Sequence, residues 1–285
     1  MRTVFGQCYN LSMTTWNTHS PRSPLPRPLT LGVTVLLFWS FAATASTTPA
    51  PQSNQAPAVT NIPQTIEPWL LTPELVIAGA AKKYQKKIDE LQQGHLLDRR
   101  ATRLDYLNRI LLRLQASGYQ QYPASANWQW ELHTSDELHE SSYCMAGGKL
   151  LINLPHIEEM NLNEAELAML ISHEMAHALL LHHYLEDQEA LRLFPAWSTR
   201  PFSEFEDAVD EDDVIIRALA EFNKTQEYEA DRAGFQLAMQ AGYSAKQLLR
   251  FYDKLRKRSA HPNFDSLSHP APAQRLLRLR EMVAQ

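Results

Sequence analysis

Apolar residues recur at helical spacing through most of the chain after residue 66. This spacing predicts helices over residues 73–93, 98–117, 214–239, 244–257 and 272–283. A further helix begins after Asn163, a good N-cap, and Glu166 stands where it completes a capping pair. Because that helix is apolar on nearly every side, we expect it to be buried. Gly118 is the expected stop of the second helix.

A short β region is predicted between the second helix and the buried one. Residues 128–132 alternate between apolar and polar, and the runs 141–145 and 149–153 flank Ala146-Gly147-Gly148, which indicates a hairpin or bulged edge. The predicted fold class is therefore α+β and mainly α-helical, with a small sheet beside the buried helix. Residues 195–213 break the helical pattern with two prolines and an acidic run, which favours a solvated loop, and the Lys82, Lys83, Lys86, Lys87 cluster favours a solvated helix face.

The amino-terminal residues have the pattern of a secretory leader. Arg22 and Arg27 precede an apolar run, and Ala43-Thr44-Ala45 fits a cleavage site, so residues 1–45 are predicted to be a signal peptide cleaved near Ala45. The start at Met1 or at Met13 stays open. The apolar run of about 15 residues is short for a membrane anchor, although membrane association stays open. Residues 46–65 predict a disordered linker, and residues 66–285 a single folded domain.

Composition narrows the partners. The chain has 27 basic and 32 acidic residues, a formal charge of −5, and without the three leader arginines the balance is 24 − 32 = −8. Such a body offers no basic field for nucleic acid, so we expect no nucleic-acid partner. Cys8 lies in the leader, so Cys144 is left without an internal disulfide partner and is interpreted as a small buried thiol.

The buried helix contains the clearest chemical motif, His173-Glu174-Met175-Ala176-His177. Residues four apart share a helix face, so His173 and His177 can point two imidazoles at one ion. Glu174 can then reach a water on that ion as a general base. Burying these three polar side chains would be costly unless something binds them, which favours a site over a structural role.

A zinc hydrolase needs a third protein ligand and an open position. Glu227 and Asp231 lie at i and i+4 of a predicted helix, so both can face the first motif. We expect Glu227 to bind one Zn²⁺ per chain and Asp231 to accept the N–H of a ligand imidazole. Glu229 is off that face, and exposed helix charges are the alternative interpretation of the whole group.

Three separated motifs carry a family resemblance. They are His173-Glu174-Met175-Ala176-His177, the segment from Glu227 to Gly234, and Ser268-His269-Pro270 followed by Arg275. The chain resembles the zinc metallopeptidase family that includes the CAAX prenyl proteases and HtpX, and within it the soluble periplasmic members LoiP and BepA. Tyr143 to Lys149 is similar to the family segment in which Gly-Gly precedes a strand beside the active site. The chain departs from the family pattern at Ser142, Ala146 and Leu154-Pro155.

The resemblance implies roles and a setting. His269 is expected to approach the zinc as a regulatory or transition-state-stabilising group, and Arg275 to orient its neighbours. The implied activity is metalloendopeptidase cleavage of unfolded or misassembled proteins in the periplasm, with outer-membrane or assembly-machinery proteins as candidate partners. The strand at 149–153 is expected to be an edge on which extended substrate pairs, with Gly147, Gly148, Lys149, Leu150 and Leu151 as the binding residues. The alternative is a chaperone-like binding protein whose zinc is latent or structural.

Overall fold

The computed structural model describes residues 69–138 and 140–285, so the predicted signal peptide and linker lie outside the described residues. The helices are α1 (Pro73–Gln93), α2 (Ala101–Gln121), α3 (Leu154–Glu159), α4 (Glu164–Leu179), α5 (His182–Leu193), α6 (Phe202–Glu211), α7 (Asp213–Gln240), α8 (Ala245–Arg258) and α9 (Pro272–Ala284). Short 3₁₀ helices span Pro123–Asn127 and Pro195–Thr199. The strands are β1 (Glu131–Ser135), β2 (Tyr143–Met145) and β3 (Lys149–Asn153). The described part of the chain is thus mainly helical with one small sheet, as the hydrophobic pattern predicts.

The predicted hairpin is present, but its second strand is not an edge. β2 and β3 pair antiparallel around the Gly147–Gly148 turn, where both glycines have positive φ. β1 pairs parallel to the other side of β3, which gives the order β1-β3-β2. The expectation that residues 149–153 form a free edge is therefore wrong, because β3 is hydrogen-bonded on both sides. The outer strand of the sheet that packs against α4 is β2.

The segment expected to be a solvated loop is also different. Residues 202–211 form α6, whose Phe205 is fully buried and stacks on Trp69 at 5.6 Å between ring centroids. Its acidic face is not simply solvated either, because Asp210 pairs with Lys83 of α1 at 2.6 Å. Lys87, expected on a solvated face, is buried and pairs with Glu137 at 2.8 Å. Tertiary contacts therefore override the local signal of prolines and charges.

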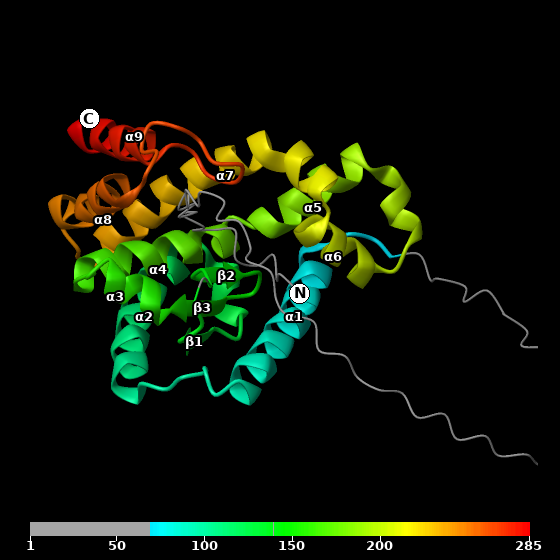
Figure 1. Cartoon of the computed structure of the whole chain (residues 1–285), viewed down its shortest axis with the longest axis horizontal. Helices are drawn as coiled ribbons and strands as arrows, with labels where there is room; N and C mark the ends of the chain where they lie inside the picture. Colours follow the sequence, from blue (N-terminus) through cyan, green and yellow to red (C-terminus); the bar gives the residue numbers. More distant parts are fainter. Residues whose placement is uncertain (1–68, 139) are drawn as a thin grey trace, which may run out of the picture. The chain divides into compact units, whose positions relative to one another are not determined.

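Helix α4 is buried as predicted and holds the sheet, α2, α7 and α8 around it (Figure 1). Its capping box is formed, since the Asn163 side chain accepts from the Glu166 backbone and Glu166 accepts from the Asn163 backbone. α2 runs through Gly118 to Gln121, so the predicted stop at Gly118 is wrong. None of the helices in the described ranges has the length and apolar character needed to cross a bilayer.

Gly234 of α7 allows α7 and α4 to approach each other closely. A Cβ at this position would lie 2.7 Å from the backbone nitrogen of His173 and 2.8 Å from its Cα. Backbone atoms of a buried helix cannot move aside as the end of a flexible side chain can. The absence of a side chain at Gly234 therefore sets how near the α7 face comes to His173.

We expect Gly234→Ala to destabilise the protein by about 1–3 kcal/mol, because the overpacking cost exceeds the roughly 1 kcal/mol that alanine gains by helix propensity. Urea unfolding measures this change. Gly118→Ala is the matched control, since its Cβ would meet only Leu237 and Leu179 side-chain carbons at 3.7 and 3.9 Å. That variant should be neutral or slightly more stable. Equal destabilisation of both variants would contradict the close-approach argument.

Candidate metal centre

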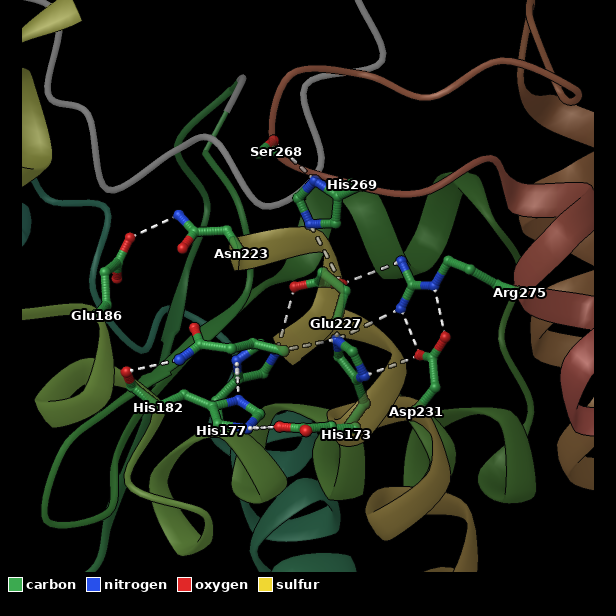
Figure 2. A network of polar contacts seen from close by, with 12 residues as sticks. His173, His177, His182, Glu186, Asn223, Glu227, Asp231, Ser268, His269 and Arg275 are labelled. Carbon is green, nitrogen blue, oxygen red and sulfur yellow. Dashed lines mark hydrogen bonds and ion pairs between the residues drawn. The ribbon is translucent and has the colours of Figure 1, made fainter. Parts of the chain in front are cut away.

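Two helices bring three candidate ligands to one point (Figure 2). On α4, the Nε2 atoms of His173 and His177 lie 3.4 Å apart. From α7, Glu227 places Oε1 3.2 Å from His177 Nε2 and Oε2 3.5 Å from His173 Nε2. These three side chains form a group whose ligand atoms all lie within 4.8 Å of one another. His177 and Glu227, which are 50 positions apart in the sequence, thus meet because α4 and α7 direct these side chains toward each other.

The spacing of these atoms fits a zinc ion. Zinc bonds to nitrogen and oxygen of about 2.0–2.1 Å in a tetrahedron require ligand atoms about 3.3 Å apart. The 3.4 Å separation of the two imidazole Nε2 atoms agrees with this requirement, and the Glu227 carboxylate lies 3.2 Å from His177 Nε2 through Oε1 and 3.5 Å from His173 Nε2 through Oε2. Buried oxygens of Glu174 and Glu227 also receive no hydrogen bond from the described residues. A cation would compensate these buried acceptors, so His173, His177 and Glu227 could hold a metal ion and leave one position for water or substrate.

Asp231 and Arg275 form the support behind the ligands. Asp231 Oδ1 lies 3.1 Å from His173 Nδ1, on the side of the ring opposite the ligand nitrogen. Arg275 donates to both carboxylate oxygens of Asp231, at 2.8 Å from Nε and 2.5 Å from Nη2, and its Nη1 lies 3.3 Å from Glu227. Tyr252 donates a further hydrogen bond to Asp231 at 2.7 Å. These contacts fix the tautomer and the orientation of His173.

The charges of this cluster follow from burial and pairing. Burial alone would raise the pKa of Asp231, but the Arg275 guanidinium outweighs it and lowers that pKa to about 2. Glu227 is likewise held well below its usual pKa, because neighbouring His269, Arg275 and the two α4 imidazoles outweigh burial. For His173, the hydrogen bonds to Asp231 and Glu227 overcome burial and raise the pKa to about 10 without a metal. Binding a cation at Nε2 must therefore release a proton from this ring.

Glu174 differs from the other acids of the site. It is 2% exposed, and burial raises its pKa to about 8. Its Oε1 receives no hydrogen bond from the described residues. A carboxyl group with a pKa near neutrality and a free oxygen beside the ligand atoms suits proton transfer.

His269 reaches the centre from the segment between α8 and α9. Its Nε2 lies 3.6 Å from Glu227 Oε2, and its Nδ1 lies 2.8 Å from the Ser268 hydroxyl. It is not one of the three side chains in the ligand group. Burial lowers the pKa of His269 to about 4, so the ring is neutral at physiological pH. The structure therefore places it beside the ligands and not among them.

The other residues selected from the sequence lie elsewhere. Gly147 and Gly148 form the hairpin turn, and Leu150 and Leu151 are fully buried in the central strand β3. Lys149 is buried too, and its Nζ donates to the Gln129 carbonyl at 2.7 Å. An incoming peptide cannot pair with this strand. Cys144 of β2 is a buried free thiol, as expected.

His182 is a contact that sequence reasoning missed. Its Nδ1 lies 3.1 Å from His177 Nδ1, and its Nε2 lies 3.3 Å from Glu229. Burial lowers the pKa of His182 to about 2, so its ring is neutral and its Nδ1 can accept from a His177 N–H when His177 binds a metal through Nε2. His182 thus orients His177 as Asp231 orients His173. Its position five residues after His177 was the available sequence signal. The αL conformation of Leu181, which precedes the helix that begins at His182, cannot be predicted from the sequence.

Replacing His182 with Leu should weaken zinc affinity about 10–100-fold, because the His177 N–H loses its acceptor. Competition with a chelating dye measures the affinity. His183→Leu is the matched control, since His183 has no contact with a ligand imidazole in the described structure. The account of His182 is contradicted by an unchanged affinity in His182→Leu or by an equal loss in both variants.

A cavity of about 170 Å³ opens beside the ligands. Its walls include β2 residues 143–145, Glu174 and His177 of α4, and Glu227 of α7. β2, an outer strand of the described sheet, therefore lies along the same cavity as Glu174. An extended peptide can add to the outer edge of this strand and reach Glu174 at the same time.

A buried helix with two imidazoles, a carboxylate from a second helix and a further unpaired carboxyl group define the site of a metallopeptidase. Residues 102–283 match the model of peptidase family M48, and the chain belongs to this family of zinc-dependent metallopeptidases. The matched residues include the whole site described above. A search of the curated proteins finds no match.

Proposed function

We propose that the chain is a zinc metalloendopeptidase of the HExxH plus ExxxD type. His173, His177 and Glu227 hold one Zn²⁺, and Glu174 is the general base. The observation that carries this proposal is the convergence of three side chains whose ligand atoms lie within 4.8 Å of one another, next to a buried carboxyl group with an unpaired oxygen. Membership of family M48 supports the same conclusion.

Zn²⁺ in this place supplies Lewis acidity, which polarises a peptide carbonyl and makes nearby water more acidic. Glu174 takes the proton of the attacking water and later passes it to the leaving amine. Arg275 and Asp231 keep His173 oriented through the reaction. In the tautomer that we propose, His269 Nδ1 accepts from the Ser268 hydroxyl 2.8 Å away, and the Nε2–H stabilises negative charge developing on the carbonyl oxygen.

The substrate we propose is an extended segment of an unfolded or misassembled protein. It pairs with the outer edge of β2, residues 143–145, because β2 ends the described sheet and borders the cavity. Main-chain pairing recognises backbone more than side chains, which suits proteins that have lost their fold. The setting we propose is the periplasm, in the branch that resembles LoiP and BepA, with outer-membrane or assembly-machinery proteins as partners.

Casein cleavage by the purified chain tests this function. We expect cleavage by the zinc-loaded protein, its loss after treatment with a chelator, and its return when one equivalent of zinc is added. The alternative, a chaperone-like binding protein with latent zinc, predicts instead that the zinc-loaded protein suppresses aggregation of unfolded substrate without cutting it. If latency came from His269, His269→Ala would release cleavage that the wild type lacks.

A further inference from the structure

The cavity beside the metal centre continues away from it. It extends from Glu227 along α7 to Asn223, and from there to Glu186 of α5 and Val209 of α6 (Figure 2 shows the first three). Its volume of about 170 Å³ is below the range of about 300–1,000 Å³ typical of sites for small molecules. A space of this size next to a peptidase centre suits one substrate side chain.

The charge of this cavity is negative. The described residues that line it include four carboxylates but no lysine or arginine. Glu174 and Glu227 belong to the metal centre. Asp210 is already paired with Lys83 at 2.6 Å. Glu186 is the fourth of these carboxylates.

Glu186 has no cation for its charge in the described structure. Its contact is a hydrogen bond from the amide of Asn223, at 2.6 Å, which is neutral. The nearby His183 adds no positive charge, because burial lowers its pKa to about 4. Burial raises the pKa of Glu186 itself to about 7, which expresses the cost of an uncompensated carboxylate there.

Asp187, the neighbour of Glu186 on α5, is a second buried acid close to the cavity, although it does not line it. It is 6% exposed. Burial raises its pKa far above the usual value, and Glu186, Asp210 and Glu206 add to this effect. Buried acids left unpaired in a protein carry a cost that a bound cation would remove.

The position of Glu186 suits a residue next to the scissile bond. Asn223, which holds it, precedes Glu227 by four residues on α7, a rise of about 6 Å along the helix. A peptide paired with the β2 edge would direct a side chain along this turn. The cavity wall also contains Met145, Val209 and Ile216, which provide apolar surface for a methylene chain.

We propose that this cavity is a specificity subsite for a lysine or arginine side chain of the substrate, with Glu186 as the carboxylate that receives its charge. The inference rests on the proposed peptidase function and adds to it the class of residue beside the cleavage point. Asn223 acts as the positioning residue, since its amide holds Glu186 at the end of the cavity.

Cleavage of paired peptides tests the subsite. Mass spectrometry of casein fragments first locates the position that favours basic residues. Two peptides are then compared that differ there only in lysine or norleucine, an uncharged side chain of similar length. Zinc-loaded wild type should show a kcat/KM ratio of about tenfold or more for lysine over norleucine. Glu186→Gln should bring that ratio close to one.

Glu189→Gln, on the same helix and paired with Arg192 outside the cavity, is the control that should keep the wild-type ratio. Zinc content and the thermal midpoint verify that Glu186→Gln is folded. If it is not, Glu186→Asp, which retains the charge, should keep a preference for lysine. A ratio near one in the wild type, or an unchanged ratio in Glu186→Gln, overturns the subsite but not the peptidase. Failure of zinc-loaded wild type to cleave any peptide overturns both.

Discussion

Replacing Glu174 with Gln is expected to lower casein cleavage about 10²–10⁴-fold and to leave zinc bound. The amide is nearly isosteric but cannot accept the proton of the attacking water at neutral pH. The ligand atoms of His173, His177 and Glu227 are untouched by the change. Initial cleavage rates and the zinc content of the same preparation are the two measurements.

Glu164→Gln is the matched control for this experiment. It lies exposed at the start of the same helix, where it accepts a hydrogen bond from Tyr243 at 3.1 Å and lies 3.7 Å from Arg113. We expect its cleavage rate to stay within a factor of about two of the wild type, since surface substitutions have small effects. Full activity in Glu174→Gln would contradict the assignment of Glu174 as the general base.

Replacing Arg275 with Met is expected to destabilise the metal-free protein by about 3–5 kcal/mol. The guanidinium donates twice to Asp231 and lies 3.3 Å from Glu227, so its removal leaves two buried carboxylates without their cation. Asp231, whose pKa is about 2 in the folded chain, contributes stability above its usual pKa and loses it as pH falls toward 2. This contribution should be largely absent in the variant.

Urea unfolding at pH 7 in the presence of a chelator measures the loss. Arg278→Met is the control, because Arg278 is exposed and lies over the Tyr228 ring at 3.7 Å from the centroid. Such a contact is worth about 0.5–1 kcal/mol. Equal destabilisation by the two substitutions would show that the buried charges of Glu227 and Asp231 do not depend on Arg275.

The parts of the site that the sequence predicts are those set by helix periodicity. His173 and His177 share a face because they are four residues apart, and so do Glu227 and Asp231. A buried, well-capped helix then leaves few ways for the two faces to meet. The structure brings these four side chains together with contacts of 3.1–3.5 Å.

The parts that the sequence does not predict depend on contacts between distant residues. The parallel pairing of β1 with β3 makes β3 a central strand. The continuous apolar run Leu150-Leu151-Ile152 is typical of a strand buried on both faces, but the partner strand comes from residues 131–135 and no local pattern identifies it. α6 forms because Phe205 enters a core with Trp69 and Asp210 meets Lys83.

Zinc content is the measurement that tests the central claim most directly. We expect one zinc per chain in the wild type and in Glu174→Gln, and a content near zero in Glu227→Ala after dialysis against a weak chelator. This result would show that zinc binding needs Glu227 of α7 in addition to His173 and His177 of α4. One zinc retained by Glu227→Ala, or none bound by the wild type, would contradict the site described for this chain.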